Sequence, residues 1–293
     1  MLRDDMKTII CTIAACAGLL HPFAAAHAKT TDLQRSSKWQ MDYSKDACHL
    51  IANFGEGKNT VTAVLSRYEP ADSLQLRIFG KQMGAFGQFF PGTTDFGPTE
   101  NPRKVEIVVG KGKDAAMADY GNVRLDDWQP RMDGDIMPSI SPQDEAKVDS
   151  LTITTPTGRT LRLLLGSMGS PMAAMRQCTR DLVKSWGYEP TVQSALRSPA
   201  MPATNPGTWL KSSDYPKAMA QGFENGIVRF RLDIDDKGAV SSCSVLDLAG
   251  KLDFGAATCS QIVKRAQFHP ARDSAGAPIR SYFVSSVRWV MAH

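Results

Sequence analysis

Residues 226–246 read GIVRFRLDIDDKGAVSSCSVL, and this stretch decides the fold of the C-terminal part of the chain. Within 227–234, polar residues alternate with apolar ones at Val228, Phe230, Leu232 and Ile234. That is the period of a strand with one buried face. Asp235-Asp236-Lys237-Gly238 is typical of a tight turn, and a second strand pattern follows over 239–246. The stretch therefore predicts a β-hairpin.

The flanking residues extend the hairpin into an α+β unit with the order β-β-α-β. Tyr215-Pro216 opens a short helix at 217–221, and 255–267 has a helical apolar face that includes Cys259 and Ile262. A long final strand is predicted over 279–291. Its more apolar face, which we expect to be core, consists of Phe283, Ser285, Val287, Trp289 and Met291.

These residues resemble the C-terminal domain of the TonB family over 208–293, under a third of the chain. The matching pieces are Tyr215-Pro216-x-Ala218-x-Ala220, Gly226-x-Val228-x-Phe230-x-Leu232-x-Ile234, Asp236-x-Gly238-x-Val240, Leu252-Asp253, Phe268-x-Pro270-Ala271-Arg272-Asp273 and Gly276-x-Pro278. The resemblance implies a small antiparallel sheet with a helix packed on it. It also implies binding of an extended segment of an outer-membrane receptor beside the last strand, by β-strand addition.

By that resemblance, the partner-binding edge is 279–291. The expected binding residues are Tyr215, Pro216, Ile279, Tyr282, Val284, Ser286 and Arg288. The family's Gln-Pro-x-Tyr-Pro stretch is here Ser212-Ser213-Asp214-Tyr215-Pro216, which keeps only Tyr-Pro. Because a long Pro-rich spacer and a full membrane anchor are also missing, we expect a periplasmic relative that uses the same surface rather than an energy transducer.

Residues 38–188 have a β pattern of a different kind, with no family resemblance. Strand alternation runs over 60–68 and 73–79, and a hairpin is predicted across 151–165. One helix follows at 170–186, and its buried face consists of Met175, Cys178, Leu182 and Trp186. We therefore expect a β-rich, sandwich-like or curled domain closed by one helix. The Pro-rich stretch 189–207 is predicted to link it to 208–293, which makes two domains.

Residues 1–28 have the pattern of a secretory signal peptide, cleaved after Ala28. We therefore expect a periplasmic protein in a Gram-negative envelope. A lipoprotein lipidated at Cys16 is the alternative. In an oxidising compartment the cysteines outside the leader favour disulfides. Cys178 faces inward on its helix and Cys243 lies close to Cys259 in the chain, so the expected bridges are Cys48–Cys178 and Cys243–Cys259.

The chain has 293 residues and a net charge of +4, and 42% of its residues are hydrophobic and 22% charged. This composition gives no support to nucleic-acid binding, membrane spanning or metal binding. Lysine and arginine are scattered, which argues against nucleic acid. No apolar run is long enough for a spanning helix. His49, His269 and His293 lack metal-ligand spacing. We expect no enzyme, cofactor or metal. Two hypotheses remain: strand addition linked to TonB-dependent transport, or an envelope structural or interaction protein that recognises its partner through the N-terminal β domain.

Overall fold

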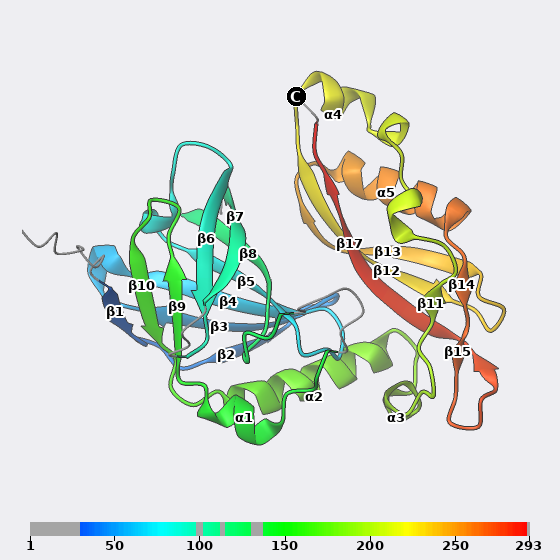
Figure 1. Ribbon diagram of the computed structural model, residues 1–293, viewed down its shortest axis with the longest axis horizontal. Coiled ribbons are helices and arrows are strands. Elements are labelled where there is room, and N and C mark those ends of the chain that lie inside the picture. Colours follow the sequence, from blue (N-terminus) through cyan, green and yellow to red (C-terminus); the bar gives the residue numbers. More distant parts are fainter. Residues whose placement is uncertain (1–29, 98–101, 112–114, 130–136, 292–293) are drawn as a thin grey trace, which may run out of the picture.

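A computed structural model describes residues 30–97, 102–111, 115–129 and 137–291. The predicted leader, with Cys16 and the cleavage site after Ala28, lies outside these residues. Within them, no helix is long and apolar enough to cross a membrane. Two main sheets organise the described residues, a large N-terminal one and a small C-terminal one, and two two-stranded sheets accompany them (Figure 1).

The large sheet has ten strands in the order β1-β10-β9-β6-β7-β8-β5-β4-β3-β2. All neighbours are antiparallel except β1 and β10, which are parallel. Its strands are β1 (Thr31–Gln34), β2 (Gln40–Tyr43), β3 (Cys48–Phe54), β4 (Val61–Arg67), β5 (Leu74–Phe79), β6 (Phe89–Asp95), β7 (Arg103–Lys111), β8 (Ala116–Val123), β9 (Ser150–Thr154) and β10 (Thr160–Leu164).

This sheet curls, so that β6 to β10 stand across the direction of β2 to β5 (Figure 1). One hydrophobic core fills the curl and takes side chains from both halves, such as Leu65 and Leu76 from one and Ile107 and Leu163 from the other. The β-rich character agrees with the sequence. The strands form one continuous sheet rather than two, because β6 pairs with both β7 and β9.

Helix α2 (Gly169–Ser185) closes the large sheet at one end, beside the short α1 (Pro142–Lys147). Its buried residues include Met172, Met175, Cys178 and Leu182, which join the same core. A disulfide joins Cys178 to Cys48 at the start of β3. The helical spacing of these side chains explains why one face of α2 is buried.

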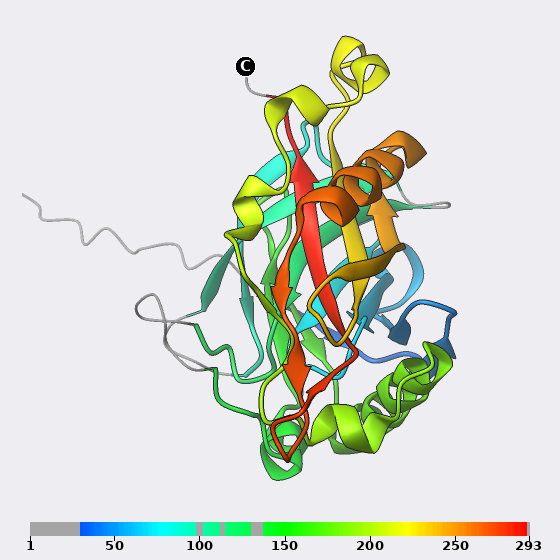
Figure 2. The same cartoon turned by 90° about the vertical axis from the view of Figure 1, so that its right-hand side faces the viewer.

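The small sheet has the order β13-β12-β17, formed by β12 (Gly226–Ile234), β13 (Val240–Ala249) and β17 (Ser281–Trp289). Helix α5 (Leu252–Arg265) covers one face, and the large sheet lies behind the other (Figure 2). This is the expected β-β-α-β order, preceded by α4 (Lys217–Gln221). A second disulfide joins Cys243 on β13 to Cys259 on α5.

Residues 189–207, predicted to be a linker, pack along the small sheet. They contain α3 (Pro190–Ser194) and β11 (Met201–Pro202), and β11 pairs with β14 (Phe268–His269). The Arg197 and Ser198 amides both donate to the Arg272 carbonyl. Ala200 is buried in the core beneath α5. The prolines therefore shape a docked segment rather than a free spacer.

The predicted final strand is split in two. Ile279 lies in β16 (Pro278–Ile279), which pairs with β15 (Ala271–Arg272), and β17 begins only at Ser281. The break has a local cause: the turn at 273–277 folds β16 back onto β15. Ile279 is thus outside the three-stranded sheet.

Candidate functional site

The outer edge of β17 is the feature that best fits the recognition of an extended partner. Along its whole length β17 pairs on one side with β12, from Gly226↔Trp289 to Ile234↔Ser281. Among the described residues, no strand pairs with its other side. An edge strand presents unpaired N–H and C=O groups, which can template another strand. At its start the Tyr188 hydroxyl donates to the Ser281 carbonyl (2.8 Å).

One face of β17 is core, as its apolar pattern predicts. Phe283 and Val287 pack under α5, and Trp289 is 5% exposed. The Trp289 ring stacks on Phe254 with centroids 5.8 Å apart, and its Nε1 donates to the Thr258 hydroxyl (3.0 Å). These contacts hold the strand flat against the helix layer and fix its register.

The other face of β17 contacts the end of α2 and the large sheet, and it is only partly covered. Tyr282 makes an edge contact with Trp186, with centroids 5.1 Å apart. Arg288 stacks over Phe89 at 4.4 Å and pairs with Glu106 (2.5 Å). Val284 lines a cavity of about 20 Å³, whereas Ser286 is exposed. A partner at β17 would thus meet an open backbone edge between a core face and a partly exposed face.

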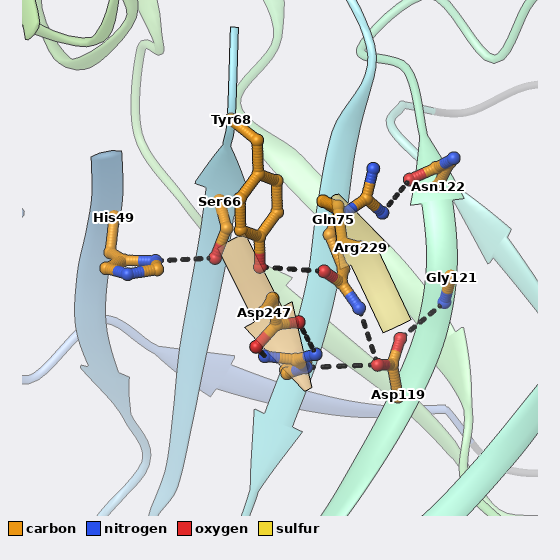
Figure 3. A network of polar contacts seen from close by, with 10 residues as sticks. His49, Ser66, Tyr68, Gln75, Asp119, Gly121, Asn122, Arg229 and Asp247 are labelled. Carbon is orange, nitrogen blue, oxygen red and sulfur yellow. Dashed lines mark hydrogen bonds and ion pairs between the residues drawn. The ribbon is translucent and has the colours of Figure 1, made fainter. Parts of the chain in front are cut away.

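A buried polar network joins the two sheets at the middle of this contact (Figure 3). The Arg77 guanidinium on β5 donates to the Asp119 carboxylate (3.0 Å) and pairs bidentately with Asp247 on β13. Asp119 also accepts hydrogen bonds from the Gln75 amide (2.7 Å) and the Gly121 N–H (2.8 Å). Its carboxylate is therefore well satisfied, and Arg77 is shared between the two sheets.

Two pKa shifts follow from this network. Burial would raise the pKa of Asp247, but the hydrogen bonds and charge of Arg77 outweigh it and lower that pKa below its usual value. Burial raises the pKa of Tyr68, whose hydroxyl donates to Gln75 (2.9 Å). At neutral pH the network therefore holds a neutral phenol and an ionised carboxylate.

Three arginines of the small sheet each stack on an aromatic ring of the N-terminal part of the chain. Arg229 lies 4.5 Å above the Tyr68 ring and Arg231 lies 4.5 Å above Trp186, in the same manner as Arg288 on Phe89. Arg229 also donates to the Asn122 side chain (3.0 Å). Each such pair contributes roughly 0.5–2 kcal/mol, depending on burial. The contact between the sheets is thus polar and cationic rather than a continuous hydrophobic core.

Comparison with known proteins adds one finding to this geometry. Residues 211–291 match the family described as Gram-negative bacterial TonB protein C-terminal. This segment is a TonB C-terminal domain. No curated protein and no solved structure matches the chain. The family is one of interaction domains rather than enzymes, and its domains interact with envelope receptors.

In this TonB C-terminal domain, Tyr215 and Pro216 have structural roles. The Tyr215 ring makes edge contacts with Phe254 (5.6 Å) and Trp289 (5.5 Å), and its hydroxyl donates to the Glu224 carbonyl (2.5 Å). Pro216 precedes α4 as its N-cap. Among the predicted binding residues, the structure therefore brings Tyr215 to the end of β17 and separates Ile279 from it.

A hydroxyl–imidazole–carboxylate row crosses β2, β3 and β4, where Asp42 lies opposite His49 and His49 opposite Ser66. The His49 Nδ1 and Ser66 Oγ atoms are 2.7 Å apart. Burial lowers the pKa of His49, and the charge of Asp42 offsets this only in part. Ser66 is 1% exposed and lines a cavity of about 20 Å³, which is too small for a substrate. The Ser66 hydroxyl is therefore shielded from solvent.

The N-terminal residues that contact the TonB C-terminal domain carry no local sequence signal of that role. Gln75 and Arg77 occupy the polar positions of an alternating strand, the positions normally exposed to solvent. Nothing local marks them as buried against a second sheet. Among the described residues, no group of His, Cys, Asp and Glu side chains has a metal-site geometry.

Proposed function

We propose that the protein is an exported periplasmic adaptor whose TonB C-terminal domain binds extended segments of outer-membrane receptors or other envelope proteins. Binding occurs by strand addition at the free edge of β17 and is linked to TonB-dependent transport. The observation that carries the proposal is the pairing of β17 with β12 on one side only among the described strands. Main-chain hydrogen bonds would then supply most of the affinity.

The contacts that already engage most side chains of β17 support an edge-on approach. Phe283 and Val287 pack under α5. Tyr282 contacts Trp186 at the end of α2, and Arg288 stacks over Phe89 on the large sheet. Within β17, Ser286 and Arg288 are exposed. Ser286 is small and leaves space for a neighbouring strand about 4.8 Å away, and Arg288 is drawn over the Phe89 ring. A partner that needed a broad side-chain surface on β17 would find little of it free.

The test is a titration of the ¹⁵N-labelled full chain with peptides from the N-terminal extensions of TonB-dependent receptors. Each peptide is made in two further forms, N-methylated at odd or at even positions. A strand in a ladder points alternate N–H groups toward its neighbour. We therefore expect shifts at 281–289 and loss of binding with one methylated form only. Equal binding of both forms, or shifts elsewhere, would contradict strand addition.

A second candidate function is an envelope interaction protein that recognises its partner through the N-terminal β domain. The extensive contact between the sheets favours it, because Arg77, Arg229 and Arg288 all anchor the small sheet on the large one. In that case the role of the TonB C-terminal domain is to pack against the large sheet of its own chain. Partner capture that survives substitution of β17 edge residues but is lost with changes on the large sheet would favour this alternative.

A further inference from the structure

Two cavities follow one another along β13, which lies at the edge of the small sheet opposite to β17. The first, of about 320 Å³, is bordered by Ser241 and Ser242 of this strand. The second, of about 770 Å³, is bordered by Ser244 and Val245. Trp186, at the end of α2, lines both cavities, so they are neighbours. Together they form an elongated groove beside the strand, which we call the β13 groove.

The groove runs past the edge of β13 rather than over one of its faces. Successive residues of a strand point to opposite faces of the sheet. Ser244 lies opposite Arg231, which also lines the second cavity. The Val245 side chain lies over Gly255 of α5, on the other face. A cavity bordered by both residues therefore meets the strand edge-on, at the edge that is not paired with β12.

That edge carries an unused hydrogen-bonding ladder. Among the described residues, β12 is the only strand that pairs with β13. The register between them is regular from Ser242↔Asp233 to Val245↔Phe230, and it is shifted on either side of this stretch. In a regular antiparallel stretch every second residue points its N–H and C=O groups away from the partner. The free groups within 242–245 thus face the groove.

These main-chain groups select the chemistry of the ligand. A hydrocarbon or an aromatic ligand against the edge would bury N–H and C=O groups without partners, which is costly. An extended peptide offers N–H and C=O groups of its own, at the strand repeat of about 3.4 Å per residue. Each backbone then satisfies the other, as in strand addition to a sheet edge.

The side chains of the groove restrict the peptide further. Lys45 and Arg231 line the second cavity together with Asp46 and Asp181, so both signs of charge are present in equal number. A strongly charged peptide therefore gains little, and one of low net charge is favoured. The Trp186 ring, which lies between the two cavities, favours an apolar side chain on the same face.

We propose that the β13 groove binds an extended segment of another protein, of low net charge, by strand addition at 242–245. Because α2 and the turn at 44–46 also line the second cavity, a single extended chain reaches the edge more readily than the edge of a folded sheet does. The site lies on the opposite side of the small sheet from β17 and does not depend on the proposed function. With both edges occupied, the sheet would hold two partners at once.

The primary test is a titration of the ¹⁵N-labelled full chain with the heptapeptide acetyl-KTVTVTE-amide, which has no net charge. We expect saturable shifts of the amides within 242–245. Two further forms of the peptide are N-methylated at odd or at even positions, and one of them should bind at least about tenfold more weakly than the other. Absence of shifts at 242–245 with millimolar peptide, shifts confined to 281–289, or equal binding of both methylated forms overturns the proposal.

A pair of variants on α2 tests the groove without altering either sheet. Ser185 is exposed and lines the second cavity, so Ser185→Trp should weaken binding of the heptapeptide at least about tenfold, a loss of about 1.4 kcal/mol. Ala173→Trp, at an exposed position of the same helix that does not border the groove, is the matched control. It should bind as the unaltered chain does. Equal affinities for all three chains contradict the proposal.

Two further measurements identify other occupants. Palmitate below its micelle concentration should leave the amides at 242–245 unshifted, and shifts as large as those with the peptide would show a site for apolar ligands instead. Sedimentation of the full chain without peptide should show no dimer that depends on β13. A dimer that Ser185→Trp dissociates would make this edge an interface between copies of the chain and overturn the proposal.

Discussion

Asp247→Asn is the substitution that tests the contact between the two sheets most sharply. It keeps the shape of the side chain and removes the charge that pairs with Arg77. Breaking a fully buried pair costs roughly 3–5 kcal/mol. Here the Arg77 and Asp247 side chains are 16% and 24% exposed, and Arg77 retains Asp119. We therefore expect a loss of about 2 kcal/mol in the free energy of unfolding, below the fully buried range.

The assay is a double-mutant cycle with Arg77→Met and Asp247→Asn, measured by urea unfolding at pH 7. The coupling free energy between the two positions should be about 1.5 kcal/mol or more, since they share a hydrogen-bonded pair. The pKa of Asp247 is lowered in the folded chain. The stability that this carboxylate contributes is therefore fully present above the ordinary pKa of aspartate, and it is lost as the pH falls through the lowered pKa. A coupling below about 0.3 kcal/mol would place the residues apart in solution and refute the docking of the sheets.

Three further predictions concern other parts of the chain. Burial raises the pKa of Glu69 to about 7, so stability should fall as pH rises from about 4.5 to 7; Glu69→Gln should remove this slope in pH-dependent thermal unfolding. The Cys48–Cys178 disulfide closes a loop of 130 residues, and its removal should lower the free energy of unfolding in urea by about 5 kcal/mol. The Cys243–Cys259 disulfide closes a loop of 16 residues, and its removal should cost about 3 kcal/mol. The reverse order would contradict the loop-entropy account. Gly238→Ala should lower the free energy of unfolding by at least about 1 kcal/mol more than Gly158→Ala. Both glycines have a positive φ, but only at Gly238 would the new Cβ lie 2.0 Å from a backbone oxygen, that of Phe268.

The C-terminal unit was predictable because its signals are local. Alternation over 227–234, the turn ending at Gly238 and the helical apolar face of α5 each specify one element within a few residues. The Cys243–Cys259 disulfide is also local, with a separation of 16 residues. Cys48 and Cys178 are 130 residues apart, but a local pattern still indicated that Cys178 is buried. Cys178 shares a helical face with Leu182, which places it in the core, where Cys48 also lies.

The architecture of the large sheet was not predictable in this way. Period-2 alternation identifies a strand and its buried face but carries no information about which strand lies beside it. The parallel pairing of Thr31 with Leu161 joins segments that are far apart in the chain, and β6 lies between β7 and the much later β9. Such long-range choices depend on the packing of the whole core.

In the candidate site, too, local patterns predict one part and only the long-range packing explains the other. The sequence located the final strand and its core face, including Trp289, from alternation alone. It left the opposite face as a binding surface, whereas Tyr282 and Arg288 contact Trp186 and Glu106. Arg77 and Asp247 are separated by 170 residues, so only the fold brings them together.

The most direct measurement of strand addition is residue-resolved amide hydrogen exchange of the full chain with and without a receptor-derived peptide. Strand addition at β17 predicts that alternate amides within 281–289 exchange more slowly when the peptide is bound, while the others, already paired with β12, change little. Uniform or absent protection along β17 with the peptide at saturation would contradict the proposed function.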